Sequence, residues 1–199
     1  MTRRFDFSRY PVLETQRLRL REITPDDAPA LSILLSDEET VKYLVDLPRQ
    51  WTDPVGVLNI MNFIQQSYHE KTAMRWAITF KQNDTLIGTC GFHRYDPANF
   101  RAEVGYDLYR AHWRQGIMEE AMRRLLVFCF EELDLHRIEA DVIEGNVASA
   151  GLLAKLGFRQ EGVWRERVFG RGKFHNLLQF GLLSREFDIG WSHRIEERS

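Results

Sequence analysis

Cysteine is scarce in this sequence, with only two residues among 199. Two cysteines are too few for a disulfide framework or a zinc cage, so we expect Cys90 and Cys129 to be small buried hydrophobic residues. The six histidines include no H-x-x-x-H pair, and no cysteine or carboxylate lies at a spacing that suggests a metal site. The sequence therefore predicts a protein that binds no metal.

Long hydrophobic runs are also missing. The first residues lack the apolar core of a signal peptide, and no stretch approaches the roughly 20 apolar residues of a membrane-spanning helix. The formal net charge is −2, without the basic excess that a nucleic-acid-binding surface needs. We therefore expect a cytoplasmic protein that binds neither a membrane nor nucleic acid.

Two common catalytic motifs are absent. The sequence contains no G-x-S-x-G nucleophile elbow and no G-K-[ST] phosphate loop, so hydrolase and nucleotide-kinase interpretations lose their main support. What is present is ordinary for a globular protein, with 44% hydrophobic and 28% charged residues. A chain of 199 residues suits one domain with an adequate core.

Apolar residues recur with strand and helix periods along the whole chain, and no repeat or linker divides it. Alternation predicts strands over Gln16–Ile23, Met74–Phe80, Leu86–His93, Ala102–Leu108 and Arg137–Ile143. Helical spacing predicts helices from Pro25, over Asp37–Leu44, from Pro54 to Glu70, from Ile117 and over Val147–Leu156. A last hairpin, Arg159–Phe169 and Lys173–Leu183, turns at Gly170–Gly172. This order predicts an α/β, three-layer sandwich.

The segment Trp113–Met118 is the most informative part of the chain. It follows a strand pattern and leads into a helical pattern, with Gly116 at the helix start. The first N–H groups of a helix have no partner within it and lie at the positive end of its dipole. Such a loop favours a phosphate or pyrophosphate, although one glycine before one helix is weak evidence by itself.

Several segments together resemble a known family. They are Glu14–Arg21, Thr24–Ala28, Glu103–Tyr106, Trp113–Met118, Asn146–Ser149 and Lys155–Phe158. Their order resembles the GNAT superfamily of acetyl-CoA-dependent N-acetyltransferases, and within it the RimJ/RimL-like branch of ribosomal-protein N-terminal acetyltransferases. The resemblance implies a single-domain α/β/α sandwich with a mixed, mostly antiparallel sheet. We expect the acetyltransferase domain over residues 14–185, between an N-terminal extension, 1–13, and a C-terminal tail, 186–199.

The resemblance also implies a cofactor, acetyl-CoA. In the family, backbone amides of the glycine loop hold the pyrophosphate, and the pantetheine arm lies as a pseudo-strand beside the E-x-G-Y strand. An asparagine side chain binds the same arm. The cofactor-binding residues expected on this basis are Leu108, Tyr109, Arg114, Gln115, Gly116, Ile117, Met118, Glu119 and Asn146.

The glycine loop departs from the family pattern at two positions. Arg114 stands where the branch usually has glycine, and its guanidinium could itself reach a phosphate. Met118 stands where the branch usually has glycine or alanine. A bulky residue there is expected to crowd the pyrophosphate unless its flexible side chain bends clear.

Two residues are the catalytic candidates that the resemblance implies. Glu103 would act on the acceptor amine directly or through a water, and Ser149 would donate to the departing thiolate or the intermediate. Each has a structural alternative: a strand-edge ion pair with Arg101 for Glu103, and a local bond in the first helical turn for Ser149. Glu166 is a second possible base, for which surface charge is the simpler explanation. Tyr106 receives no role.

The acceptor can be narrowed by the pKa of the amine. An α-amine, with a pKa of about 7.7–8.0, is roughly a tenth neutral at pH 7, whereas a lysine has a pKa of about 10.4. The difference of about 2.5 units corresponds to roughly 3.4 kcal/mol that a lysine acetyltransferase must supply. A weakly basic site therefore suits a protein N-terminus, with His93 and Trp51 as expected substrate-binding residues.

Two alternatives remain open at this point. A small-molecule acetyltransferase acting on a polyamine, an amino sugar or a toxic amine would need converging acidic groups, for which the candidates are Asp37, Glu38, Glu39 and Asp46. The non-enzyme alternative is a silent acyl-CoA-binding module. The sequence also leaves the oligomeric state open, a homodimer included.

Overall fold

An eight-stranded sheet forms the centre of the computed structural model, which describes residues 5–44 and 54–187. Its strands are β1 (Leu13–Glu14), β2 (Leu18–Glu22), β3 (Met74–Phe80), β4 (Asn83–Asp96), β5 (Arg101–Leu108), β6 (Arg137–Ile143), β7 (Arg159–Gly170) and β8 (Lys173–Leu183). They lie in the order β1-β2-β3-β4-β5-β6-β8-β7, and all neighbours are antiparallel except β5 and β6. The predicted mixed, mostly antiparallel sheet is confirmed.

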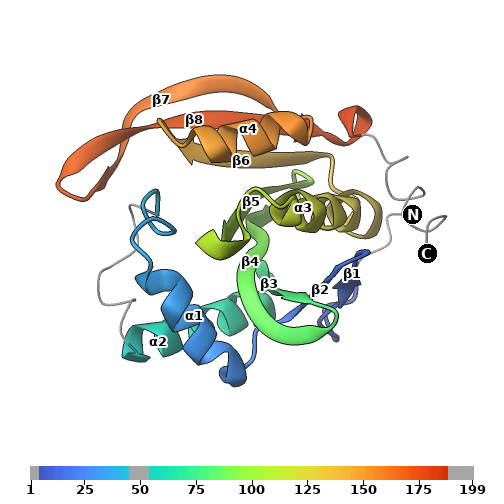
Figure 1. Cartoon of the computed structure of the whole chain (residues 1–199). Coiled ribbons are helices and arrows are strands. Elements are labelled where there is room, and N and C mark those ends of the chain that lie inside the picture. Colours follow the sequence, from blue (N-terminus) through green and yellow to red (C-terminus); the bar gives the residue numbers. More distant parts are fainter. Residues whose placement is uncertain (1–4, 45–53, 188–199) are drawn as a thin grey trace.

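Helices cover both faces of this sheet (Figure 1). The described α-helices are α1 (Ala28–Ser36), α2 (Pro54–His69), α3 (Ile117–Val127) and α4 (Val147–Lys155), with shorter helical turns at Pro25–Asp27, Arg110–His112, Phe128–Glu132 and Ser184–Glu186. On β3, Ala77 packs with α1 and α2, whereas its neighbours Trp76 and Ile78 pack in the cluster that contains α3 and α4. Successive strand residues face opposite sides, so the two helix pairs lie on opposite faces. The three-layer sandwich is confirmed.

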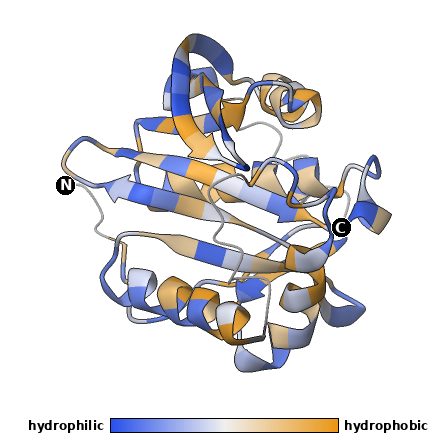
Figure 2. Ribbon diagram, turned by 90° about the vertical axis from the view of Figure 1, so that its left-hand side faces the viewer, coloured by the Kyte–Doolittle hydropathy of each residue, from blue (hydrophilic) through white to orange (hydrophobic). Residues whose placement is uncertain are grey.

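Alternation along the strands accounts for the two cores. Figure 2 shows hydrophilic and hydrophobic residues succeeding each other along the strands. The side chains of Leu18 and Leu20 are fully buried on the α3 side, whereas the intervening Arg19 is half-buried. Cys90 and Cys129 are both buried in the same cluster, as predicted, and burial raises the pKa of each thiol.

The residues before β1 pack against this larger core. The Phe5 ring lies 5.2 Å from that of Phe128, and the Tyr10 ring lies 5.5 Å from that of Trp76. The indole N–H of Trp76 donates to the carbonyl of Pro11 at 2.7 Å. In the part of the chain that the structure describes, no helix combines the length and apolar character needed to cross a membrane.

One predicted helix, Asp37–Leu44, is wrong, because this segment forms turns. The Asp37 carboxylate accepts from the N–H of Thr40 at 2.8 Å, and the chain then leaves the helical path. The carbonyl of Val41 accepts from the Arg171 guanidinium at 2.8 Å, and the hydroxyl of Tyr43 donates to the carbonyl of Gly145 at 2.9 Å. The segment keeps two local backbone bonds, from the N–H of Val41 to the carbonyl of Asp37 and from the N–H of Leu44 to the carbonyl of Val41, and the long-range bonds hold these turns against the body of the protein.

The other element boundaries agree closely with the patterns. Helix α2 ends at His69, one residue before the predicted end, and β4 extends beyond both predicted ends to Asn83 and Asp96. The predicted hairpin turn is present between β7 and β8. Arg171 and Gly172 both have positive φ, at 49° and 80°, as a two-residue hairpin turn of type I′ requires.

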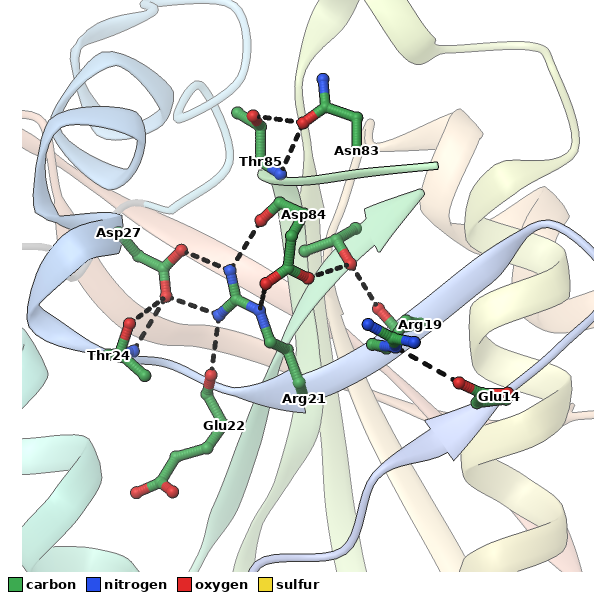
Figure 3. A network of polar contacts seen from close by, with 10 residues as sticks. Glu14, Arg19, Arg21, Glu22, Thr24, Asp27, Asn83, Asp84 and Thr85 are labelled. Carbon is green, nitrogen blue, oxygen red and sulfur yellow. Dashed lines mark hydrogen bonds and ion pairs between the residues drawn. The ribbon is translucent and has the colours of Figure 1, made fainter. Parts of the chain in front are cut away.

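A closed network of charges joins β2, the start of β4 and the turn before α1 (Figure 3). The guanidinium of Arg21 donates to both carboxylate oxygens of Asp27, at 2.7 and 2.8 Å, and to the carboxylate of Asp84 at 2.9 Å. Asp27 also accepts from the backbone N–H of Thr24 at 2.8 Å and so caps the turn that precedes α1. The network fixes how the α1 layer attaches to the sheet.

The parallel pair β5 and β6 is the irregular point of the sheet. These strands pair only over Arg101–Glu103 and Arg137–Glu139. Beyond that point β5 remains paired with β4, and β6 remains paired with β8. The facing edges of β5 after Glu103 and of β6 after Glu139 are therefore unpaired in the described sheet, and we call the space between them the β5–β6 opening.

Candidate active site

The glycine loop lies at the start of α3. Gly116 is the N-cap residue, with φ of 72°, a left-handed conformation that favours glycine. Arg114 also has positive φ, at 59°, and its side chain is exposed. The first intrahelical bond runs from the N–H of Glu120 to the carbonyl of Gly116, so the preceding N–H groups point out of the helix start. The side chain of Met118 packs against the large core.

The acidic residues in the first turn of α3 are neutralised by cations from other elements. Glu120 accepts from the Arg17 guanidinium at 2.6 Å and from the hydroxyl of Thr15 at 2.5 Å. Glu119 forms ion pairs with Lys155 at 2.5 Å and Arg123 at 3.1 Å. These pairs keep the helix start available for an anion despite its two glutamates.

Arg17 is a residue that sequence reasoning missed at this site. Besides Glu120, its guanidinium donates to the carbonyl of Gln115 at 3.2 Å and so braces the loop from β2. Its side chain lies 3.7 Å from the position of a Cβ built on Gly116. No local signal could have found it, because the contact joins residues about a hundred positions apart.

The end of β5 presents backbone groups to the β5–β6 opening. The N–H of Tyr109 donates to the carbonyl of Ile87 at 2.9 Å. In an antiparallel ladder, this bond turns the N–H and carbonyl of Leu108, and of Tyr106 two residues before, away from β4 and towards the opening. The Leu108 carbonyl accepts from the indole of Trp113 at 2.7 Å. The N–H of Leu108 can bond to a strand-like ligand in the opening, because it points away from β4. The N–H of Tyr109 cannot, because it is bonded to β4.

Asn146 and Ser149 lie at the start of α4. The side-chain oxygen of Asn146 accepts from the N–H of Ser149 at 3.2 Å, which caps the helix. This bond commits the oxygen and leaves the amide N–H₂ as the donor group of Asn146. The Ser149 hydroxyl is hydrogen-bonded to the hydroxyl of Tyr106 at 2.9 Å, so this bond joins α4 to β5 beside the opening.

Tyr106 is the second residue that sequence reasoning missed. Burial raises the pKa of its phenol to about 12, although the bond with Ser149 opposes this shift. The hydroxyl therefore keeps its proton at neutral pH and can donate it or relay it through Ser149. The sequence could have identified Tyr106, because it ends the E-x-G-Y segment and strand alternation places it on the opposite face from Glu103.

Glu103 lies on the face of β5 away from α3 and α4. Its side chain accepts from Nη1 of Arg94 at 2.5 Å and pairs with Nε2 of His93 at 3.0 Å. The residue is only 9% exposed. Burial opposes its ionisation, but the bonds from His93 and Arg94 outweigh burial and hold the pKa of Glu103 below its ordinary value. The alternative pairing with Arg101 is not formed, since Arg101 pairs with Asp96 and Glu139.

More charged groups surround Glu103 on this face. Asp107 pairs with the Arg75 guanidinium and accepts from the hydroxyl of Thr89 at 2.9 Å. Asp141 comes from β6, and its carboxylate lies 3.8 Å from the same Arg94 nitrogen that binds Glu103. The opening is thus flanked by hydroxyl groups on one face of the sheet and by carboxylates and guanidinium groups on the other. A thioester reaching into the opening would meet an amine arriving from the charged side.

The remaining candidates do not join this cluster. Trp51 and Asp46 lie outside the described residues. Asp37 caps the turn at Thr40 and pairs with Arg110 at 3.5 Å, and Glu39 pairs with Lys42 at 3.5 Å. Glu166 is an exposed residue of β7. Asp37 and Glu39 therefore already have cationic partners.

Comparisons with known proteins agree with this geometry. Residues 17–159 match the family model described as an acetyltransferase (GNAT) domain. The chain is 39% identical over 175 residues, 88% of its own length and 97% of the relative, to an uncharacterized N-acetyltransferase p20 of Bacillus licheniformis. It is 31% identical over 101 residues, 51% of this chain and 56% of the relative, to a ribosomal-protein-serine acetyltransferase of Escherichia coli (strain K12).

A solved structure shows the same fold. Mycobacterium smegmatis RimJ in complex with CoA-disulfide superposes with a TM-score of 0.80 at 23% identity, covering 95% of this chain and 93% of that one. At this identity the likeness concerns the fold.

Proposed function

The chain belongs to the acetyltransferase (GNAT) domain family of N-acetyltransferases, and on that premise we propose that it moves an acetyl group from acetyl-CoA directly to the α-amine of a protein or peptide N-terminus. The observation that carries the proposal is the β5–β6 opening, with hydroxyl groups on one face and a charged cluster on the other. We assign this activity to residues 14–185 of a cytoplasmic enzyme.

The residues at the start of α3 fit the donor. The N–H groups of Ile117, Met118 and Glu119 would hold the pyrophosphate, and Arg114 would add a cation. Met118 leaves this loop clear because its side chain packs on the core. The N–H of Leu108 and the amide of Asn146 would hold the pantetheine arm in the opening, next to Tyr109.

The hydroxyl groups of Ser149 and Tyr106 would act on the departing sulfur. Attack of the amine on the thioester places negative charge first on the carbonyl oxygen and then on the thiolate. Ser149 lies next to the opening, and its bond to Tyr106 supplies a second proton donor in line. Ser149 is thus the proposed catalytic donor, and Tyr106 the residue that positions it and restores its proton.

Glu103 would act on the other side of the reacting carbon. Its lowered pKa keeps it ionised at neutral pH, so it can stabilise the positive charge of the attacking nitrogen directly or through a water. His93, which Glu103 holds by a hydrogen bond, would line the acceptor site together with Trp51. This pairing makes Glu103 a charge-stabilising group more than a strong base.

The charges on the acceptor side favour a single amine over a polyamine. Arg75 and Arg94 lie among the carboxylates and would repel a second and third ammonium group. The acidic residues Asp37 and Glu39, which a polyamine pocket would use, are paired elsewhere. An α-amine, which is roughly a tenth neutral at pH 7, needs only modest help with its proton.

The decisive experiment offers the protein several amines at once. The purified chain is incubated with acetyl-CoA and a pool of free-N-terminus peptides, N-blocked lysine peptides, polyamines and amino sugars, and products are identified by mass spectrometry. We expect acetylation confined to free N-termini. Acetylation of a small amine alone would contradict the proposed acceptor, and binding of acetyl-CoA with no product in the pool would contradict the enzyme assignment for these acceptors.

A further inference from the structure

Asp141 is a carboxylate on the acceptor side of the sheet that has few interactions with other described residues. It lies two residues beyond Glu139, the last residue of β6 that pairs with β5, and therefore inside the β5–β6 opening. Its side chain is 16% exposed. The carboxylate has one described ion pair, the 3.8 Å contact with Arg94. Among the described residues, the side chain of Asp141 forms no hydrogen bond. Glu103, in contrast, has both oxygens bonded.

The position level with Asp141 on β5 is a glycine. Extending the parallel register beyond Glu103 and Glu139 brings Gly105 opposite Asp141. A Cβ built on Gly105 would lie 3.5 Å from the His93 ring and 3.6 Å from Nη1 of Arg75, which are ordinary contact distances. His93 and Arg75 thus lie close to the backbone of β5 at the level of Asp141.

The surroundings push the two neighbouring carboxylates apart in pKa. Burial and the charge of Glu103 raise the pKa of Asp141, which Arg94 offsets only in part. Glu139 on the same strand raises it further, and His93 lowers it, while the residue opposite on β8 is the neutral Gln179. Two acids whose environments separate their pKa values commonly divide the roles of charge stabiliser and proton acceptor.

We propose that Asp141 binds the ammonium form of the acceptor and takes one of its protons. This inference rests on the proposed N-terminal acetylation and assigns the acceptor subsite within it. The Asp141 carboxylate lies 3.8 Å from the Arg94 nitrogen that also binds Glu103, on the charged side from which the amine would reach the thioester. The nitrogen would lie over Gly105, which has no side chain, and Arg75 and His93 would border the first peptide carbonyl.

The protons balance through the reaction. An acceptor R–NH₃⁺ passes one proton to the Asp141 carboxylate and becomes R–NH₂. The nitrogen then attacks the thioester carbon, so that a C–N bond forms and the C–S bond breaks. The second nitrogen proton is transferred to the sulfur through Ser149 and Tyr106, and coenzyme A leaves as the thiol. Asp141 returns its proton to water, so one proton is released in each turnover.

The kinetic test uses Asp141→Asn, a nearly isosteric change. We expect kcat/KM for a free-N-terminus peptide to fall about tenfold at pH 7, because only about a tenth of an α-amine is neutral there. The loss should shrink towards pH 9, where solvent already removes the proton. Asp141→Glu should recover part of the activity. Asp96→Asn, the same change at a carboxylate of β4 that pairs with Arg101, is the matched control and should keep the wild-type pH profile.

Two kinetic results would overturn the proposal. Undiminished activity at pH 7 would show that Asp141 is not involved, and an equal loss at pH 7 and pH 9 would show a structural role only.

A binding measurement separates this inference from the proposed function. Calorimetry without acetyl-CoA compares a free-N-terminus peptide with its N-acetylated form. We expect the wild type to bind the free form more tightly and Asp141→Asn to lose that preference. If the wild type acetylates no N-terminus but shows the preference, the proposed function fails and the ammonium site stands. No preference in the wild type, or an unchanged one in Asp141→Asn, overturns the site.

Discussion

Two charged networks on the same sheet are built from the same residue types with opposite results. The Arg21 network is closed: the guanidinium is divided between Asp27 and Asp84, and the Asp27 side chain is 5% exposed. The Glu103 network is open: His93 and Arg94 reach into solvent, and Asp141 holds Arg94 only at 3.8 Å. In the Arg21 network the charged groups are bonded to one another, whereas in the Glu103 network Asp141 has only a long contact with Arg94.

The difference shows how position in the sheet decides the role of an ion pair. Arg21 lies where β2, the start of β4 and the turn before α1 all supply partners, so its charge is met by carboxylates from two other elements (Figure 3). Glu103 lies at the last paired position before the β5–β6 opening, where half of the neighbours that a sheet normally supplies are missing. Charges at such an edge remain available to a ligand.

Removing the centre of the closed network should have the largest effect. Arg21→Met leaves the buried Asp27 carboxylate without its cation, which typically costs about 3–5 kcal/mol of unfolding free energy. Urea unfolding measures this change. The matched control is Arg19→Met on the same strand, whose pairing with Glu14 is about half exposed, at 42% and 47%, and is worth at most about 1 kcal/mol. Equal losses in both variants would contradict the comparison.

The open network should respond in the opposite way. Glu103→Gln removes the charge that we place beside the attacking nitrogen, and we expect kcat/KM to fall about ten- to a hundredfold, or about 1.4–2.7 kcal/mol in activation free energy. Unfolding free energy should change by less than about 1 kcal/mol, because the cationic partner Arg94 is 67% exposed and His93 is 42% exposed. Steady-state kinetics and urea unfolding on one preparation measure both. A large loss of stability with normal kinetics would make Glu103 structural.

The smallest expected effect is that the charges of Asp27 and Asp141 change the unfolding free energy in opposite directions, and that both contributions depend on pH. Burial opposes ionisation of Asp27, but Arg21 and Thr24 hold its pKa below the ordinary value, so its stabilisation is present at neutral pH and is lost as the pH falls through its folded pKa. Burial and Glu103 raise the pKa of Asp141, so its charge costs stability at neutral pH, and this cost disappears in acid.

Asparagine variants at these two positions measure that difference. Asp27→Asn should destabilise the protein at pH 7, and Asp141→Asn should stabilise it. Both differences from the wild type should narrow as the pH falls from 5 to 3, which urea unfolding at each pH can follow. Shifts of the same sign at pH 7 would contradict the opposite pKa directions of the two groups.

The sequence predicted what depends on local periodicity. β3 and β6 appear with their predicted bounds, and the glycine at the start of α3 has the backbone conformation that the loop pattern implied. The segment Asp37–Leu44 was misassigned because it forms turns that bond to Arg171 and to the carbonyl of Gly145, more than a hundred residues away. Local pattern cannot contain that information.

The candidate site was predictable only in the part that motifs mark. Glu103 and Ser149 lie on opposite sides of the opening, in keeping with the roles proposed for them. Arg17 and Asp141 could not be found from sequence, because their importance comes from what the fold places next to them. Tyr106 was within reach, since strand alternation alone puts it on the face opposite to Glu103.

The β5–β6 opening has a consequence for the stability of the whole protein. Only three residue pairs join β5 to β6, so the sheet is two ladders joined by a short parallel pairing, by the shared core and by bonds such as that between Tyr106 and Ser149. A strand-like molecule in the opening would form backbone hydrogen bonds with the unpaired edges of both ladders. The native state would then be stabilised by its own substrate, by about 2.7 kcal/mol at a hundred times the dissociation constant. The concentration of acetyl-CoA would then determine how stable the junction between the two ladders is.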